Sequence, residues 1–201
     1  MIKTVMLDMG NVIVPVDFRR CHTALAAACS YPPHEIRKRI RLTGLPERFE
    51  CGQVSPEEFV RELSSILNMR VSNGEFWEIW SNIFGPEPLL PESLIEALCR
   101  QRRLLLLSNT NPIHFEWIRE RYSLLRHFHS YVLSYEVGAL KPSPRIYQEA
   151  IARADCQPEE CFFADDDATN VEGAKREGID AVQFQSREQL EAELRLRGIC
   201  W

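Results

Sequence analysis

Short segments of continuous apolar residues recur along the chain, and each has the length of one buried strand. They lack the polar alternation of a strand with one wet face, so they favour parallel strands covered on both faces. Segments with helical periodicity lie between them, and the repeated order of strand, helix and strand predicts an α/β fold with a doubly wound parallel sheet. The predicted strands are residues 4–9, 103–109, 130–135, 160–165 and 179–184, and the predicted helices between them are residues 92–101, 112–125, 144–154 and 170–177.

The region after the first predicted strand has a different pattern, because it contains several helical segments and no convincing strand. Ser55 is a good helix start, since its hydroxyl can cap a helix and the proline and acidic residues that follow suit a first turn. The segment LPERFECG (45–52) has no regular periodicity and is predicted to be a loop, and the proline-rich FGPEPLLPES (84–93) is predicted to be a return linker. We therefore predict an α/β core of residues 1–14 and 86–201, interrupted by a small all-helical domain of residues 15–85.

The composition narrows the class of protein. A chain of 201 residues is long enough for one sizeable core. Its formal net charge of −5 argues against nucleic acid as a main partner, because phosphate backbones need a basic face. The N-terminus has no signal-peptide pattern, and no apolar run approaches the ~20 residues that a membrane span needs. The seven cysteines form no C-x-x-C pair and are interpreted as reduced, mostly buried thiols. We therefore expect a cytoplasmic protein, and we expect neither nucleic acid nor a membrane among its partners.

Polar residues stand where the predicted strands end, which is the edge at which ligands bind to an open parallel sheet. Asp8 ends an apolar run, where a carboxylate needs a cation or hydrogen bonds to compensate its burial. Taken singly, the others have structural explanations: Ser108 suits a helix cap, Lys141 a solvated turn, and an acidic triplet a helix N-terminus. The residues concerned are Asp8, Ser108, Asn109, Lys141, Asp165, Asp166, Asp167 and Asn170.

Together these residues indicate chemistry rather than structure. Clustered carboxylates repel one another unless a cation neutralises them, and hard oxygen ligands of this kind suit Mg²⁺. A magnesium ion, a lysine and a hydroxyl around one aspartate form a phosphoryl-transfer site, in which positioning and charge neutralisation do most of the work. The pattern therefore predicts a Mg²⁺-dependent enzyme with a small phosphorylated substrate.

Four motifs follow one another in the order typical of the haloacid dehalogenase (HAD) superfamily of hydrolases, and the chain resembles that superfamily over its whole length. The motifs are LDMGNV, LLSNTN, GALKPSPRIY and FFADDDATNVEGAKREG, with a helical cap inserted after the first. The segments DMGNVIV and RFECGQVSPEEF resemble the branch of bacterial sugar-phosphate phosphatases, which includes an α-glucose-1-phosphate phosphatase. The resemblance implies a HAD-like Rossmannoid core whose cap sets the substrate specificity.

The resemblance also implies a role for each residue of the predicted site. Asp8 would be the nucleophile, forming an aspartyl phosphate that water then hydrolyses, and Lys141 would be catalytic through its charge. Mg²⁺ would be held by the Asp8 carboxylate, the Gly10 backbone carbonyl and Asp166, with Asp165 as a neighbour or further ligand. The phosphoryl oxygens would be bound by Ser108, Asn109, Lys141 and the backbone N–H groups of Met9 and Gly10, and Asn170 would steady the acidic loop.

Gly10 stands where most phosphatases of this superfamily carry a second aspartate, which protonates the leaving group. General acid catalysis typically contributes about 10²- to 10⁴-fold, so its loss matters. Two interpretations remain open. Either the leaving group departs without much help, as an anomeric sugar oxygen does, or another residue supplies the proton. Asp17, His22 and Glu50 are the candidates, because they flank the cap junction or a cap loop.

The predicted function is hydrolysis of a small phosphorylated metabolite, with a sugar phosphate as the first choice. One alternative is a catalytically weak phosphate-binding or regulatory protein that lost turnover with the second aspartate. Another is a metal-independent dehalogenase, which also lacks that aspartate but for which three adjacent acidic residues would be a liability. A signalling receiver domain is excluded, because its acid pair lies on the first strand and it has no helical insert. The sequence indicates neither the exact substrate nor an oligomeric state, and the cap aromatics Phe49, Phe76, Trp77 and Trp80 suit either a cap core or sugar contacts.

Overall fold

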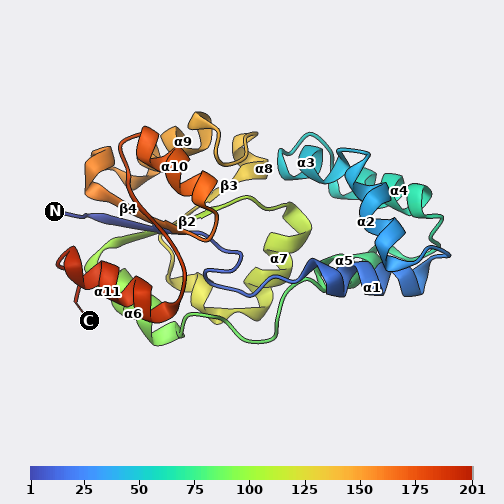
Figure 1. The fold of residues 1–201 in the computed structure, drawn as a ribbon, viewed down its shortest axis with the longest axis horizontal. Coiled ribbons are helices and arrows are strands. Elements are labelled where there is room, and N and C mark those ends of the chain that lie inside the picture. The colour runs from blue at the N-terminus through green and yellow to red at the C-terminus, as the bar shows by residue number, and fades with distance from the viewer. Residues whose placement is uncertain (201) are drawn as a thin grey trace.

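Parallel strands form one sheet in the order β3-β2-β1-β4-β5 in the computed structural model, which describes residues 1–200 (Figure 1). Each predicted strand is present and is one or two residues shorter than expected. Because β1 lies in the middle of the order, the chain winds outward from it in both directions, which confirms the doubly wound α/β fold. The strands are β1 (Thr4–Leu7), β2 (Arg103–Ser108), β3 (Ser130–Leu133), β4 (Cys161–Asp165) and β5 (Asp180–Gln183).

Both faces of the sheet are covered, as the continuous apolar runs require. In β1, Val5 and Leu7 belong to the core cluster on one face, whereas Met6 belongs to the cluster on the other. Successive side chains of a strand point to opposite faces, so in a strand with helices on both sides every side chain is buried and none faces water. Figure 1 shows α6 (Glu92–Gln101), α7 (Pro112–Arg121) and α11 (Arg187–Leu196) on one side of the strands, and α9 (Pro144–Ala154) and α10 (Ala168–Arg176) on the other.

Some boundaries differ from the prediction. The helix expected over residues 112–125 ends at Arg121, and a 3₁₀ turn (Ser123–His127) follows. Tyr122 separates them in an extended conformation, because its ring is buried and its hydroxyl donates to the Gly85 carbonyl. The end of the strand predicted over 130–135 belongs to the short helix α8 (Ser134–Val137). These are tertiary effects on boundaries and leave the order of elements unchanged.

The inserted segment folds into helices that gather beyond one end of the strands (Figure 1). Ser55 caps its helix as predicted, in a capping box with Glu58. The segment 45–52 was expected to be a loop, and this was wrong, because most of it forms a short helix that packs through Leu45 and Phe49. The helices are α1 (Phe18–Ala28), α2 (Pro33–Arg41), α3 (Leu45–Glu50), α4 (Pro56–Leu67) and α5 (Asn73–Ser81), and we refer to them as the cap.

The chain crosses between core and cap twice, and the two crossings lie side by side. Val16 and Phe84 form an antiparallel bridge, with hydrogen bonds from Asp17 N to Ile83 O (2.8 Å) and from the Gly85 N–H to the Pro15 carbonyl (3.0 Å). This junction lies within two residues of the predicted limits of the cap, 15 and 85. We therefore propose that residues 15–85 form a separate structural unit that joins the core at this bridge.

Most of the cap aromatics form the core of the cap. Phe49 stacks on Phe59 with ring centroids 4.1 Å apart, and Phe76 and Trp80 pack around the same ring. Trp80 also stacks on His114 of α7, at 5.5 Å between centroids, and so joins the cap to the core. Trp77 is partly exposed. These contacts occupy three of the four aromatics that were considered for sugar binding.

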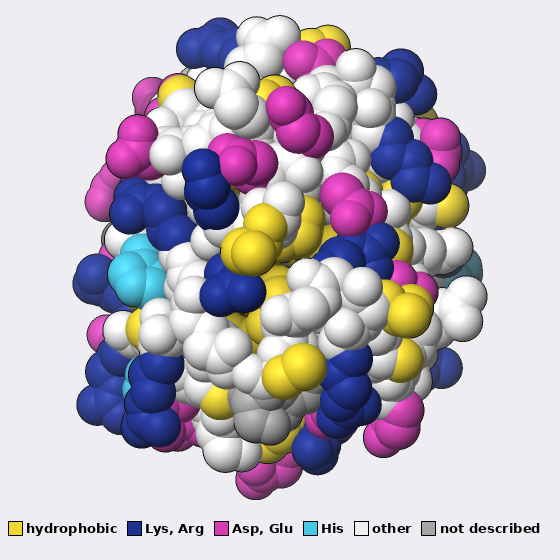
Figure 2. Space-filling model, turned by 90° about the vertical axis from the view of Figure 1, so that its left-hand side faces the viewer, with side chains coloured by type: hydrophobic (Ala, Val, Ile, Leu, Met, Phe, Trp, Pro, Cys, Tyr) yellow, Lys and Arg dark blue, Asp and Glu magenta, His cyan; other side chains and the backbone are white. Residues whose placement is uncertain are grey.

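The face of the molecule opposite the cap shows basic and acidic side chains intermingled, without an extended area of one sign (Figure 2). None of the cysteines forms a disulfide, and Cys21 and Cys161 are buried. No helix in the described part of the chain is long and apolar enough to cross a lipid bilayer.

Candidate active site

Asp8 and Asp165 emerge side by side from the centre of the sheet. Leu7 pairs with Ala164 of β4, so the residues that follow them stand at the same level on the carboxyl edge. Asp166 comes next, and carboxylate oxygens of all three residues lie within 4.8 Å of one another. Asp8 and Asp165 are buried and Asp166 is half-buried. The strand register thus concentrates three carboxylates at one point, as the sequence predicted.

Lys141 lies between two of these carboxylates. Its Nζ donates to Asp8 Oδ1 (2.7 Å), to Asp165 Oδ2 (2.6 Å) and to the Leu107 carbonyl oxygen (2.9 Å). Burial lowers the pKa of Lys141, but the two carboxylates outweigh that effect and leave the pKa above its ordinary value. The ammonium therefore stays charged, and its three hydrogens are all engaged by the protein.

The carboxylates still outnumber the positive charge near them. Burial raises the pKa of Asp8 to about 7, although the attraction of Lys141 opposes this rise. Repulsion from Asp165 raises the pKa of Asp8 further. A carboxylate can attack only when it is ionised, so a second cation near Asp8 would favour the reactive form.

Asp165 is held by the chain on both of its oxygens. Oδ1 accepts from the Asp167 backbone N–H (2.8 Å) and from Asn170 Nδ2 (3.1 Å), and Oδ2 accepts from Lys141. Asn170 therefore lies where it was predicted, beside the acidic loop. Asp167 serves as the N-cap of α10 by accepting from the Thr169 N–H at 2.7 Å. Of the acidic triplet, only Asp167 has the purely structural role that was considered for such residues.

Asp166 is oriented by a residue that the sequence analysis did not single out. Asn11 Nδ2 donates to Asp166 Oδ2 at 3.0 Å, and Asn11 Oδ1 accepts from the Val16 N–H at 3.0 Å. Asn11 has a left-handed backbone, with φ of 54°, a conformation that asparagine tolerates better than most residues. The asparagine after Gly10 in DMGNV was the available signal, because a turn of this kind favours that residue type.

Gly10 has ordinary backbone geometry, and a side chain there would require only that the neighbouring Val16 side chain shift by a few tenths of an ångström. Its φ is not in the left-handed region, and a Cβ atom there would lie 3.3 Å from Val16 Cγ2. Its carbonyl oxygen accepts no hydrogen bond from residues 1–200. Gly10 lines the same cavity as Asp8 and Asp166, and carboxylate and carbonyl oxygens are the hard donors that Mg²⁺ takes, so the residues present fit that ion.

Ser108, Asn109 and Thr110 at the end of β2 differ in their hydrogen-bond partners. Ser108 is buried, and its hydroxyl donates to the Asn109 carbonyl at a long 3.4 Å. The Asn109 side chain forms two hydrogen bonds with the backbone of Lys141: it accepts from the N–H (2.7 Å) and donates to the carbonyl (3.1 Å). Thr110, which the sequence analysis passed over, is buried beside the site with a hydroxyl that has no hydrogen-bond partner in the described structure. Its position at the strand end in SNT was the signal for it.

A cavity of about 170 Å³ lies in front of Asp8 and Lys141, between core and cap. Of the residues that the sequence analysis assigned to the site, Met9, Gly10, Asn109, Asp166 and Asn170 also line this cavity, whereas Ser108 and Asp165 do not. The remaining lining residues are Asn11, Val16, Phe18, Glu50, Ile83, Phe84, Thr110 and His114.

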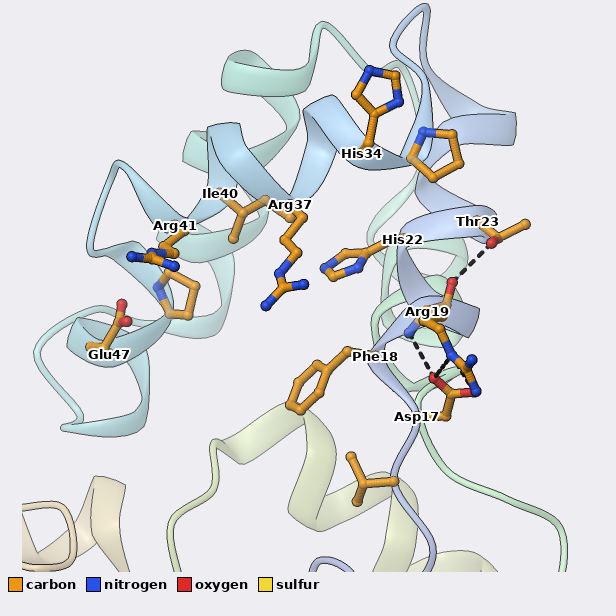
Figure 3. A pocket seen from close by; sticks show the side chains of 13 residues that line it. Asp17, Phe18, Arg19, His22, Thr23, His34, Arg37, Ile40, Arg41 and Glu47 are labelled. Carbon is orange, nitrogen blue, oxygen red and sulfur yellow. Dashed lines mark hydrogen bonds and ion pairs between the residues drawn. The ribbon is translucent and has the colours of Figure 1, made fainter.

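A larger cleft of about 820 Å³ lies within the cap and shares Val16 and Phe18 with this cavity. In Figure 3, the His22 ring and the Arg37 guanidinium point toward each other across the cleft, and Asp17 is bound to Arg19. Asp17 and His22, two of the candidates for the missing acid, therefore belong to this cleft rather than to the cavity at Asp8.

A family model supports the resemblance seen in the motifs. The model described as a haloacid dehalogenase-like hydrolase matches residues 2–178. The chain is 27% identical over 200 residues to the D-ribitol-5-phosphate phosphatase of Bacteroides thetaiotaomicron, covering 96% of this chain and 97% of the relative. It is 24% identical over 214 residues to the glyceraldehyde 3-phosphate phosphatase of Methanopyrus kandleri, covering 92% and 84%.

The fold has a solved counterpart that contains the ions expected at such a site. A HAD-family enzyme from Bacteroides thetaiotaomicron, solved in complex with magnesium and inorganic phosphate, superposes with a TM-score of 0.84 at 26% identity. The match covers 93% of this chain and 96% of that chain. The similarity therefore extends over both the core and the inserted helices.

Proposed function

This chain belongs to the haloacid dehalogenase-like hydrolases, and on that basis we propose that it is a magnesium-dependent phosphatase of a small phosphorylated metabolite. The observation that carries the proposal is the buried Lys141 shared by Asp8 and Asp165, with Asp166 beside them at a cavity. A protein that needed this cluster only for stability would gain nothing from opening it to a cavity, because buried ion pairs are a weak source of stability.

Magnesium fits the oxygen atoms that the chain leaves free. Asp8, Asp166 and the Gly10 carbonyl would hold the ion, and Asp165 would stay behind them because its oxygens are already bonded. When bound, the ion supplies positive charge that neutralises both the carboxylates and the oxygens of a phosphoryl group. Asn11 and Asn170 hold Asp166 and Asp165 in place for it.

Asp8 is the proposed nucleophile. Its oxygen attacks phosphorus, the bond to the ester oxygen breaks, and water then hydrolyses the aspartyl phosphate. Lys141 fixes the orientation of the Asp8 carboxylate through its 2.7 Å hydrogen bond and keeps positive charge next to it. The Thr110 hydroxyl and the Gly10 N–H, neither of which donates to a backbone carbonyl in the described chain, suit the phosphoryl oxygens. The Met9 N–H, which interacts with the Asp8 carboxylate, remains a further proposed donor. Lys141 lines the cavity and remains a further proposed contact, whereas Ser108, which the sequence also suggested, does not line it.

The substrate class follows from the size and surroundings of the cavity. A space of about 170 Å³ holds a phosphoryl group and little more, so the rest of the substrate extends past Val16 and Phe18 toward the cap cleft. The similar enzymes are named for phosphates of a sugar alcohol and of a triose. We therefore propose a sugar phosphate or sugar-alcohol phosphate, with the cap selecting among them.

The test is release of inorganic phosphate from p-nitrophenyl phosphate and a panel of sugar and sugar-alcohol phosphates. Turnover should vanish in EDTA and return with Mg²⁺. Asp8→Asn should lower it by roughly 10³-fold or more, since the attacking charge is lost. Asp155→Asn is the matched control, because it makes the same change at an exposed helix end whose left-handed conformation suits asparagine.

Undiminished turnover in chelator would contradict the metal, and appreciable activity of Asp8→Asn would contradict the nucleophile. Phosphate binding without turnover of any substrate would favour the alternative of a phosphate-binding or regulatory protein. Release of halide from haloacids in EDTA would favour the dehalogenase.

A further inference from the structure

Gly10 cannot donate a proton, so the acid must come from another residue if the site has one. Apart from Asp8, three residues that line the cavity carry a carboxyl or an imidazole group. These are Glu50, His114 and Asp166. Asp166 is bound to Asn11 and is a proposed ligand of the ion, so it is not free to donate a proton. The question is which of the remaining two can give a proton to a leaving oxygen.

His114 is unsuited to this task because both of its ring nitrogens are engaged. Nδ1 lies 3.0 Å from Asn111 Nδ2, which can only donate, so Nδ1 is an acceptor. Nε2 lies 3.1 Å from the Trp80 carbonyl oxygen and therefore carries the proton. Burial lowers the pKa of His114 to about 4, so the ring stays neutral near pH 7. The hydrogen bond from His114 Nε2 to the carbonyl of Trp80 therefore links the core to the cap.

The other sequence candidates are also excluded by position. Asp17 caps α1 and is bound twice by Arg19, whose hydrogen bonds hold the pKa of Asp17 below its ordinary value. It is therefore ionised at neutral pH. His22 lines the cap cleft opposite Arg37 (Figure 3) and does not line the cavity that contains Asp8.

We propose that Glu50, the last residue of the cap helix α3, is the general acid that protonates the leaving oxygen. Glu50 lines the cavity with Asp8, and its carboxyl makes no hydrogen bond or ion pair within residues 1–200. This inference rests on the proposed phosphatase function. It assigns to the cap the role that the second aspartate of the first motif has in most relatives.

The environment of Glu50 keeps its proton available near neutral pH. Burial raises the pKa of Glu50 to about 7, and Glu47 in the same helix adds to the rise. Asp8, Asp166, Lys141 and His114 face Glu50 from the rest of the cavity wall. A carboxylic acid with a pKa close to the working pH is protonated often enough to donate and acidic enough to do so efficiently.

Gly52 explains how a cap residue is delivered to a core site. A Cβ atom on Gly52 would lie 2.1 Å from the Tyr135 carbonyl oxygen, so the backbone after α3 packs directly on α8 of the core. Gly52 also has a φ of 66°, which favours glycine. Figure 1 shows α3 next to α8. This close approach holds the end of α3, and with it Glu50, at the cavity.

The proton balance of the reaction is complete with Glu50. As Asp8 attacks phosphorus and the bond to the ester oxygen breaks, that oxygen takes the proton of the Glu50 carboxyl. The products are the aspartyl phosphate, a neutral alcohol and the Glu50 carboxylate. Water then attacks phosphorus, the bond to Asp8 breaks, and Glu50 takes the proton that water loses. One water is consumed and both carboxyl groups return to their starting state.

The test compares esters with good and poor leaving groups. In Glu50→Gln, kcat/KM for an alkyl ester such as a sugar-alcohol phosphate should fall about 10²- to 10⁴-fold, whereas kcat/KM for p-nitrophenyl phosphate should fall less than about tenfold, because its leaving group departs unprotonated. The comparison uses kcat/KM because this constant ends at loss of the alcohol and leaves out hydrolysis of the aspartyl phosphate, which both esters share. The ratio of the two rates in the wild type should decline as the pH rises through neutrality, and this decline should be absent in the variant. Titration of Asp8 or Lys141 affects both esters alike and cancels from the ratio.

Two further variants sharpen the result. Glu57→Gln removes the same charge from an exposed position of the cap outside both cavities and should change neither rate. Gly10→Asp in the Glu50→Gln background should restore part of the alkyl-ester rate, since the φ at Gly10 is not left-handed and the one close neighbour of an added Cβ is the Val16 side chain at 3.3 Å.

Equal losses for both esters in a folded Glu50→Gln protein, or no loss for either, would overturn the proposal. The wild type provides a test that does not depend on how any variant folds: a rate that falls steeply with the pKa of the leaving alcohol would show that the site has no acid. A wild type that releases phosphate from neither ester would instead contradict the proposed phosphatase function.

Discussion

Lys141 has an environment that few lysines have, with a side chain only 1% exposed between two carboxylates. Moving charges out of water costs several kcal/mol per ion, and the attraction within such a cluster does not reliably exceed that cost. Removing one partner is worse, because it leaves an uncompensated buried charge. We therefore attribute the cluster to the proposed reaction rather than to stability.

Replacing Lys141 by methionine should consequently affect stability and activity together. Asp8 and Asp165 would lose their counter-charge, so we expect Lys141→Met to cost about 3–5 kcal/mol in the free energy of unfolding and to abolish turnover. The loss should be largest at alkaline pH, where the carboxylates are ionised. Urea denaturation in EDTA at pH 5 and pH 8 measures this without compensation by a metal ion.

Lys175→Met is the control, because Lys175 is exposed and pairs only with Glu172 on the same helix. Such a pair contributes at most about 0.5 kcal/mol. If Lys141→Met were as stable as the wild type but inactive, Lys141 would only bind substrate, and the description of it as the counter-charge of the cluster would be wrong.

At the scale of elements, the short helix α3 connects the cap to the site. Its apolar residues Leu45 and Phe49 are buried in the cap, while the chain just after it packs on α8 of the core. An α-helix places residues one apart on different sides, so Phe49 and Glu50 can serve the cap core and the cavity at once. The position of Glu50 then depends on how closely this segment approaches the core.

Gly52→Ala should displace that segment. Its Cβ would meet a backbone oxygen that cannot move aside, in addition to the strain of a side chain at a φ of 66°. We expect a loss of stability of about 1–3 kcal/mol and a selective loss of alkyl-ester turnover, in the same sense as Glu50→Gln. Thermal unfolding and the ratio of alkyl- to aryl-ester rates measure the two effects.

Gly44→Ala separates strain from contact, because Gly44 has a similar φ of 61° but a Cβ atom there would meet no other atom within 4 Å. It should carry the strain alone and keep the ratio of rates unchanged. A Gly52→Ala protein with the stability and the rate ratio of Gly44→Ala would show that the approach to Tyr135 has no influence on the site.

At the scale of the molecule, the cavity between core and cap is lined by two titratable groups whose effects on stability have opposite signs. Glu50 has a pKa raised from 4.5 to about 7, so the folded state holds a proton that the unfolded state loses between these values. Stability therefore falls as the pH rises from about 4.5 to 7. His114 has a pKa lowered from 6.5 to about 4, so stability falls as the pH decreases from about 6.5 to 4.

Glu50→Gln should remove the first of these effects. The wild type should lose up to about 3 kcal/mol more than the variant between pH 4.5 and pH 8, and less to the extent that water reaches the carboxyl. Denaturation in EDTA at several pH values gives the difference directly, because the contributions of Asp8 and His114 are common to both proteins. Parallel curves for the two proteins would show that Glu50 titrates normally.

The pattern of the sequence determined the order of elements, the parallel sheet and the identity of most of the site. Apolar runs such as Val5–Leu7 and Leu104–Leu107 have no reason to be continuous unless both faces are covered, and the carboxyl ends of parallel strands necessarily meet at one edge. Asp8, Lys141 and Asp166 could therefore be placed together from the sequence alone. The capping of a helix by Ser55 could also be predicted from the sequence, because capping depends on residues that are close together in the chain.

Tertiary structure decided what depends on contacts between distant segments. It broke the helix at Tyr122 through a hydrogen bond to Gly85, and it made a helix of residues 45–50 where periodicity was too short to be recognised. It also separated three equivalent candidates for the acid, leaving Asp17 and His22 in the cap cleft and Glu50 at Asp8. Sequence spacing does not indicate which of the three candidates lies at Asp8. Glu50 is brought there by the close approach of two backbone segments, at Gly52 and Tyr135, which are more than eighty residues apart in the chain.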